Sequence, residues 1–212
     1  TGVKNTGVAI HLEKRIPFEA GMAGGSTDAA CVLRLLNRAF DRPLSKKQLA
    51  ETALKLGADV PFCLWGGTAL AGGVGEKLKP LAPMPDCFIV VAKPQFSVST
   101  KAAFGLYDQQ PDLHCPDSTA MVQALEQGNL QAISENLYNS LEKPVGGAYP
   151  RILQLVERLD SAGALGARMT GSGSAVFGIF DDRQKAKKAM SGLRLLCREV
   201  YLTRPLAGKS EK

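Results

Sequence analysis

Residues 17–30 have the sequence Pro-Phe-Glu-Ala-Gly-Met-Ala-Gly-Gly-Ser-Thr-Asp-Ala-Ala. Alternating apolar residues precede this stretch and a helical pattern follows it, which predicts a glycine-rich loop that leads into a helix. Gly21, Gly24 and Gly25 allow the backbone to adopt positive φ and to approach a ligand closely. Because the first amides of a helix have no partner within it, the stretch predicts an anion site, most often for phosphate.

Two hydroxyl residues, Ser26 and Thr27, follow the glycines and can bond phosphate oxygens, ligate a metal or cap the helix. The stretch lacks the Gly-Lys-Ser/Thr of a Walker A loop and the Gly-x-Gly-x-x-Gly of a dinucleotide site. Taken alone, it therefore leaves two interpretations open: a phosphate site, or a plain turn in which Ser26 is the N-cap.

The composition is that of a globular protein with one large or two small domains: 212 residues, of which 45% are hydrophobic and 22% charged. No long apolar run and no basic-then-apolar leader occurs, so we expect neither a membrane span nor secretion. The five scattered cysteines form no Cys-x-x-Cys, which favours a reducing cytoplasm over disulfides or a zinc site. A net charge of +6 suits polyphosphate substrates, with nucleic-acid binding as the alternative.

The pattern along the chain predicts helices mixed with strands. In the expected first strand Val8, Ile10 and Leu12 alternate with other residues, so that one face is buried and His11 points outward. Asp28 lies in the first turn of the expected first helix, where the helix dipole stabilises a carboxylate. Metal ligation is the alternative role for this side chain. Helices are expected over 26–40, 45–56, 100–107, 118–126, 130–137, 149–162 and 182–196, and strands over 8–12, 66–73, 74–80, 87–93, 166–170, 175–180 and 199–203. Ser45 and Gln48 predict a capping box for the second helix, and the continuous apolar run over 87–93 predicts a buried strand.

One acidic residue, Asp59, is held between Gly57 and Pro61 in the sequence Leu-Gly-Ala-Asp-Val-Pro. It suits a turn aspartate that caps a short helix. It also suits a carboxylate that is presented rigidly and acts as general base toward a substrate hydroxyl. The residue pattern alone favours the cap.

Three features occur in one order: the glycine-rich loop at 17–30, Leu-Gly-Ala-Asp-Val-Pro at 56–61, and Thr-Gly-Ser-Gly-Ser at 170–174. In this order they resemble the GHMP kinase superfamily, which includes galactokinase, homoserine kinase, mevalonate kinase and phosphomevalonate kinase. The sequence is most similar to the branch that phosphorylates 4-diphosphocytidyl-2-C-methyl-D-erythritol in non-mevalonate isoprenoid biosynthesis. The resemblance covers nearly the whole chain.

The first motif matches that branch's Pro-x-x-x-Gly-Leu-Gly-Gly-Gly-Ser-Ser, with Met22, Ala23 and Thr27 in place of Leu, Gly and Ser. Three shorter blocks also resemble the family, namely residues 73–76, 99–100 and 139–142.

The resemblance implies an α+β, two-domain GHMP fold. Residues 1–84 would be the remainder of an N-terminal, ATP-binding domain like that of ribosomal protein S5, truncated here, and residues 85–212 a ferredoxin-like C-terminal α/β sandwich. It implies a cytoplasmic kinase that uses ATP with Mg²⁺, acts on a small-molecule alcohol as a monomer or homodimer, and binds neither nucleic acid nor membrane. No residue is assigned as a metal ligand.

The resemblance also implies a set of site residues. Asp59 would take the proton from the substrate hydroxyl, and Phe104 would offer its ring to the cytosine. The residues that would bind ATP phosphates are Pro17, Gly21, Ala23, Gly24, Gly25, Ser26 and Thr27. Those that would bind the substrate, or close over it and the phosphates, are Thr100, Phe104, Thr170, Gly171 and Ser172.

The family departs from this sequence at the N-terminus, where it is longer. Its Ala-Lys-x-Asn-Leu motif, whose lysine neighbours the catalytic aspartate, and its Asp-Gly-Tyr-His motif, which helps hold the cytosine, do not occur in this sequence. We therefore expect the 212-residue polypeptide alone to have little or no kinase activity and to expose a sheet edge that is prone to association. Turnover at an ordinary kinase rate would contradict this.

Two other functions remain as alternatives. A sister kinase that acts on homoserine or a mevalonate compound is disfavoured by residues 56–61. A non-catalytic RNA-binding module is suggested by the C-terminal order of strand, hairpin, helix and strand. That module needs exposed aromatics on one sheet face, whereas Phe177 and Phe180 have opposite parity along their strand.

Overall fold

A computed structural model describes residues 7–41, 43–110 and 117–206. The contacts within it divide the described chain into two compact units. The first unit contains residues up to 16 together with 23–80, and the second contains 17–22 together with the chain from 81 onward. The glycine-rich loop therefore divides between Met22 and Ala23.

Three helices and a hairpin form the first unit. Their bounds are α1 Gly24–Ala39, α2 Lys46–Leu56, α3 Val60–Trp65, β1 Ala69–Gly72 and β2 Lys77–Pro80. The helices bury a small apolar cluster, composed of Ala30, Leu49, Ala53, Val60 and Leu64. The predicted capping box at the start of α2 is confirmed, because Ser45 and Gln48 each accept a backbone amide of the other.

The prediction of a half-buried strand over residues 8–12 is wrong. Residues 7–15 have no regular secondary structure, and Val8, Ile10 and Leu12 are 52–61% exposed. Alternation of apolar residues produces a strand only where a neighbouring strand supplies hydrogen bonds and a core covers one face. Among the described residues neither sheet includes this segment. His11 is exposed, as expected.

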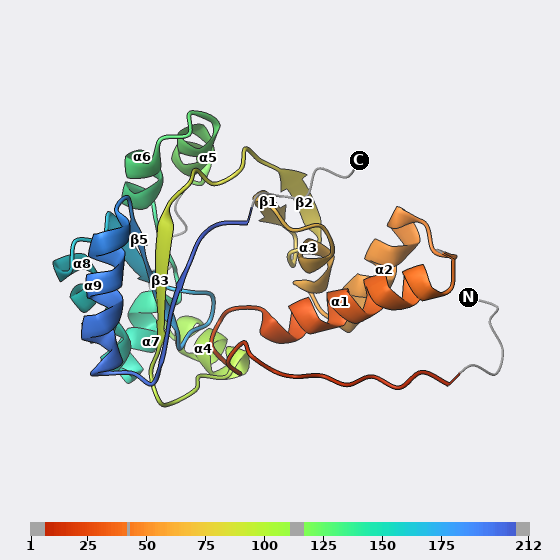
Figure 1. Cartoon of the computed structure of the whole chain (residues 1–212), viewed down its shortest axis with the longest axis horizontal. Helices are drawn as coiled ribbons and strands as arrows, with labels where there is room; N and C mark the ends of the chain where they lie inside the picture. The colour runs from red at the N-terminus through yellow and green to blue at the C-terminus, as the bar shows by residue number, and fades with distance from the viewer. Residues whose placement is uncertain (1–6, 42, 111–116, 207–212) are drawn as a thin grey trace. The chain divides into compact units, whose positions relative to one another are not determined.

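The second unit contains a four-stranded antiparallel sheet in the order β4-β5-β3-β6. The strands are β3 Phe88–Lys93, β4 Gly166–Met169, β5 Val176–Phe180 and β6 Glu199–Thr203, and the helices are α4 Thr100–Tyr107, α5 Thr119–Glu126, α6 Leu130–Glu135, α7 Glu142–Ala148, α8 Arg151–Ser161 and α9 Arg183–Arg194. Strand β3 lies between β5 and β6, as its continuous apolar run predicted. Helices α8 and α9 pack side by side on the sheet (Figure 1), and none of the described helices has the length and apolar character needed to cross a bilayer.

The start of α1 and the whole of α7 differ from prediction. Helix α1 begins at Gly24 after Ala23, which has φ 47°, so Ser26 lies inside the helix and is not its N-cap. Helix α7 was not predicted, because Pro144, Gly146 and Gly147 are poor helix formers. Its Val145 is fully buried in the core of the unit. Tertiary packing therefore outweighs propensity there.

Candidate functional site

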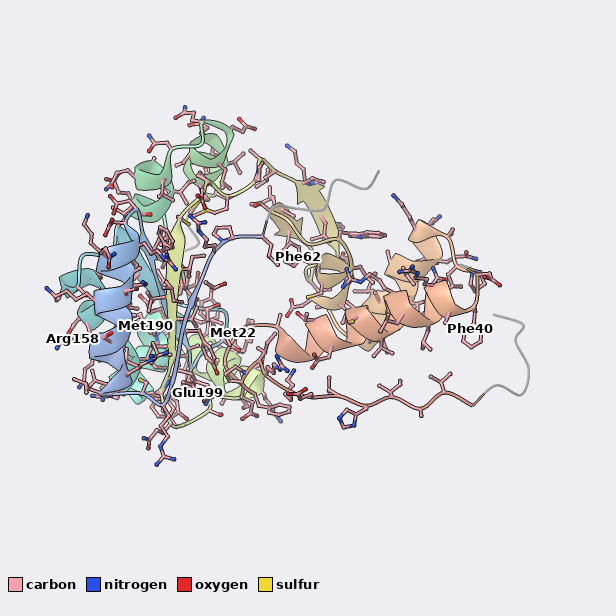
Figure 2. The ribbon with its side chains drawn as sticks, viewed as in Figure 1. Met22, Phe40, Phe62, Arg158, Met190 and Glu199 are labelled. Atoms are coloured by element: carbon pink, nitrogen blue, oxygen red, sulfur yellow. The ribbon has the colours of Figure 1, made fainter. Side chains whose placement is uncertain are left out.

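The first half of the glycine-rich loop, residues 17–22, lies against the turn at residues 170–174 of the same unit, which we call the late turn. Met22, the last residue of this half, is labelled in Figure 2. Gly21 has φ +68°, and a Cβ built on it would overlap the carbonyl oxygen of Thr170. The Thr170 hydroxyl donates to the carbonyl of Gly21 at 3.0 Å, and the amide of Ser174 donates to the carbonyl of Glu19 at 3.3 Å. The structure thus joins two stretches that sequence analysis predicted to share a site.

The second half of the loop forms the start of α1. The first intrahelical bond runs from the Thr27 amide to the carbonyl of Ala23 at 2.9 Å, and no described side chain caps this helix end. The amides of the first turn therefore keep their hydrogen-bonding capacity for a ligand. A Cβ built on Gly25 would meet no atom within 4 Å, so space is open beside that residue. This combination of directed amides and open space fits a phosphate.

A lysine that sequence analysis missed lies beside this helix end. The Lys14 ammonium forms an ion pair with the carboxylate of Asp28, and their side chains are only 16% and 26% exposed. A Cβ built on Gly24 would lie 3.1 Å from Lys14 Nζ, which places the cation next to the first turn of α1. Sequence spacing gave no signal for the pair, because Lys14 belongs to an irregular segment and its partner to a helix.

The candidate base, Asp59, occupies the N-cap position of α3 and is exposed. Its side chain makes no capping bond to a described residue, so the carboxylate does not cap the start of the helix. Helix α3 packs against α1. The Thr27 hydroxyl lies 3.6 Å from the sulfur of Cys63, and Cys63 is one helical turn after Asp59. Asp59 is therefore one helical turn away from a residue that contacts the loop hydroxyl.

The turn of the β1–β2 hairpin lies beside the residue that precedes this acid. A Cβ built on Gly75 would be 3.4 Å from the carbonyl oxygen of Ala58. The Glu76 carboxylate accepts the amide of Val74 at 2.8 Å. Bonds from the backbone amides of Glu76 itself and of Val74 hold the pKa of this carboxyl below its usual range. An ionised Glu76 therefore fixes a turn that flanks Asp59.

The expected substrate residues of the second unit also come together. Thr100 Oγ1 lies 3.2 Å from Ser172 Oγ, which joins the start of α4 to the late turn. Gly171, between Thr170 and Ser172, has φ +52°. Phe104 lies one turn after Thr100 and is 50% exposed. Its ring is therefore presented at the surface and does not fill a core.

The two phenylalanines of β5 do not supply the exposed aromatics that the RNA-binding alternative needs. Phe180 is fully buried and Phe177 is half-buried, so the two do not form an exposed aromatic platform.

Family comparisons agree with this geometry. The model described as GHMP kinases N terminal domain matches residues 1–67, and the model described as GHMP kinases C terminal matches residues 121–198. A relative from Caldicellulosiruptor bescii, named 4-diphosphocytidyl-2-C-methyl-D-erythritol kinase, is 47% identical over 98% of this chain and 72% of its own length. The chain belongs to the GHMP kinase family. A relative of this GHMP kinase from Clostridium botulinum strain Alaska E43 carries the same name, with 42% identity over 95% of this chain and 72% of its own length.

Solved structures support the same family. The crystal structure of a 4-(cytidine 5'-diphospho)-2C-methyl-D-erythritol kinase matches with a TM-score of 0.79 and 37% identity, over 92% of this chain and 70% of that one. A homoserine kinase from Cytophaga hutchinsonii matches with a TM-score of 0.76 over 92% of this chain and 69% of that one, but at 18% identity it shows the fold alone. The predicted resemblance, the α+β GHMP fold and the assignment as a kinase, a phosphotransferase, are therefore confirmed.

Proposed function

We propose that this GHMP kinase transfers the γ-phosphoryl group of ATP to the 2-hydroxyl of 4-diphosphocytidyl-2-C-methyl-D-erythritol. The names of its relatives supply the substrate. One observation carries the proposal for this chain: α3 packs against α1, so that exposed Asp59 and the uncapped start of α1 belong to the same unit. Phosphoryl transfer needs mainly positioning and charge neutralisation, and this arrangement offers both.

The start of α1 would hold the nucleotide. Directed amides and the positive end of the helix dipole favour the phosphates. The proposed phosphate-binding residues are Pro17, Gly21, Ala23, Gly24, Gly25, Ser26 and Thr27. Mg²⁺ would accompany the nucleotide and would be bound mainly through phosphate oxygens and water. When bound, the ion would neutralise charge on the transferred group.

Asp59 would act on the acceptor. As the substrate oxygen bonds to the γ-phosphorus and the bond to the β–γ bridging oxygen breaks, ADP leaves and the hydroxyl proton passes to the Asp59 carboxylate. The exposure of this carboxylate is what allows it to meet a substrate.

The second unit would recognise the cytidylyl end of the substrate. We assign Phe104 as the ring on which cytosine stacks, because an exposed aromatic face binds a base well. The hydroxyls of Thr100 and Ser172, which already face each other, would bond the sugar or diphosphate. Thr170 and Gly171 complete the set. The proposal includes a division into domains at residues 1–84 and 85–212, a cytoplasmic location, and a monomer or homodimer.

The test uses the complete polypeptide that the gene encodes. ADP release is followed with the cytidylyl substrate, and the product is identified by phosphorus NMR. Asp59→Asn is expected to lower kcat by about 100-fold or more while it leaves the binding of an ATP analogue intact. The control Asp41→Asn changes an exposed aspartate outside the site, at a positive φ that asparagine tolerates. Preference of the wild type for homoserine or mevalonate, or high activity in Asp59→Asn, would overturn the proposal.

A further inference from the structure

Strand β4 is an edge strand of the second unit's sheet, and side chains form hydrogen bonds with the backbone groups on its outer side. Met169 pairs with Val176, while the Thr170 amide donates to the carbonyl of Ala175 at 3.0 Å. In an antiparallel ladder, hydrogen-bonded and non-hydrogen-bonded pairs alternate. The amide and carbonyl of Met169 therefore point away from β5, off the edge of the sheet.

Two side chains from residues 139–142 satisfy both groups. Glu142 Oε2 accepts the Met169 amide at 2.5 Å. Asn139 Nδ2 donates to the carbonyl of Met169 at 2.7 Å and to that of Gly171 at 2.8 Å. The Leu141 amide donates to Asn139 Oδ1 at 2.9 Å, which fixes the orientation of the Asn139 amide. An asparagine and a glutamate thus replace a neighbouring strand.

Contacts with Leu137 and with Asp160 of α8 hold the strand further along its length. Arg168 Nε donates to the carbonyl of Leu137 at 3.0 Å. The carboxylate of Asp160 accepts the amide of Ala167. The edge is therefore fixed from residue 167 to residue 171, and the last contact lies inside the turn that touches the glycine-rich loop.

We propose that Asn139 and Glu142 are positioning residues of this kinase, which hold the 170–174 turn where it orders the glycine-rich loop and the cytidylyl site. The inference rests on the proposed function of that turn. Neither side chain is proposed to touch a substrate. Each acts through the backbone of Met169 or Gly171, and no match to the family assigns them this role.

Ordering the turn costs conformational entropy, although the Gly173 amide donates to the carbonyl of Thr170 within it at 2.9 Å. Gly171 and Gly173 both have positive φ, at +52° and +79°, and glycine has the largest conformational freedom to lose on ordering. Asn139 bonds the carbonyl of Gly171 directly. On one side the turn contacts Gly21 through Thr170, and on the other it contacts Thr100 through Ser172. Release of the turn would therefore loosen both halves of the site in this unit.

The experiment compares Asn139→Ala and Asn139→Asp with Asn136→Ala in the complete polypeptide. Asn136 is a matched control, because it is an exposed asparagine whose Nδ2 bonds a carbonyl inside α6, that of Ala132. Asn139→Asp keeps the acceptor for Leu141 but loses both donated bonds. We expect both Asn139 variants to raise the Kd of a fluorescent ATP analogue, and the KM of each substrate, at least fivefold, and to speed hydrogen exchange of the Gly173, Ser174 and Ala175 amides. The control should match wild type.

Glu142 gives a second pair of variants with opposite expectations. Glu142→Gln keeps an oxygen that accepts the Met169 amide, so its KM should stay within about twofold of wild type. Glu142→Ala loses the bond and should behave like Asn139→Ala. Normal behaviour of Glu142→Gln separates positioning by an accepting oxygen from a need for the negative charge.

Two failures are distinguishable. If Asn139→Ala lowers kcat only in proportion to its folded fraction, with KM and amide exchange unchanged, the role is merely structural and the inference is overturned. If the wild type itself neither binds the ATP analogue nor phosphorylates the cytidylyl substrate, the proposed function fails. In that case the exchange rates of the turn amides still decide whether Asn139 orders the turn.

Discussion

At the scale of single residues, Gly21 is the position where the backbone leaves least room for a side chain. Its φ is +68°, and a Cβ would overlap the Thr170 carbonyl. We expect Gly21→Ala to lower the free energy of unfolding by about 2 kcal/mol or more, because strain and overlap add. Gly192→Ala is the control, since a Cβ there, within α9, meets nothing within 4 Å and should stabilise by about 0.5–1 kcal/mol. Urea unfolding measures both, and equal effects would contradict the contact.

The Lys14–Asp28 pair is the second feature at this scale. Both side chains are mostly buried, so each charge depends on the other. A double-mutant cycle with Lys14→Ala and Asp28→Ala should give a coupling energy of about 1–2 kcal/mol, between the values for exposed and buried pairs. Urea unfolding of the four proteins provides it. A coupling near zero would mean that the pair does not stabilise the start of α1.

At the scale of elements, α2 depends on its N-terminal cap. The Gln48 amide donates to Ser45 Oγ at 3.3 Å, and the Ser45 amide donates to Gln48 Oε1 at 2.9 Å. Ser45→Ala should cost about 1 kcal/mol of stability. Thr52→Ala, in the same helix, removes only a hydroxyl bond back to the Gln48 carbonyl and should be neutral or slightly stabilising. Far-UV circular dichroism and urea unfolding measure both variants. A loss of helix content and stability in Thr52→Ala but not in Ser45→Ala would contradict a stabilising cap at Ser45.

The Glu142 carboxylate, which accepts the Met169 amide at the edge of β4, makes the stability of the protein depend on pH. Burial raises the pKa of Glu142, and Asp160 raises it further, while the Met169 amide and Arg168 oppose the rise. The folded protein therefore keeps this proton to a higher pH than the unfolded chain does, and this contribution to stability falls as pH rises above about 4.5. Glu142→Gln removes the titration, so its stability relative to wild type should grow between acidic and neutral pH. Thermal unfolding of both proteins at several pH values measures this. A difference in melting temperature between Glu142→Gln and wild type that is the same at all pH values would exclude the effect.

At the scale of the whole molecule, the cysteines differ in reactivity according to where the fold places them. Cys31 is exposed, whereas Cys87 and Cys197 are buried. Burial raises the pKa of the Cys87 thiol to about 11, and it also raises the pKa of Cys197. Native alkylation at pH 8 should therefore label Cys31 within minutes and leave Cys87 and Cys197 unmodified until the chain is denatured. Peptide mass spectrometry reads this directly, and early labelling of Cys87 would show that its unit opens.

Particular elements show how far the sequence could predict the fold and the site. The run of β3 and the cap of α2 were predicted correctly because their signals are local: continuous burial in one case and two side chains three residues apart in the other. The strand over 8–12 was predicted wrongly, and α7 was missed, because pairing and burial by distant residues decide both. The Lys14–Asp28 pair and the bonds from Asn139 to Met169 and Gly171 gave no sequence signal, since they join residues 14 to 32 positions apart.

The sequence by itself determined the family, through three motifs in a fixed order, and the residue types of the site: glycines before a helix, one acid between a glycine and a proline, and a glycine-serine turn. Each of these depends on local backbone chemistry. Only the tertiary structure decided that Asp59 is exposed at the start of α3, that α3 packs against α1, that Gly21 lies on the carbonyl of Thr170, and that Asn139 and Glu142 bond the edge of β4. These contacts arise from packing between elements far apart in the chain, which no local pattern encodes.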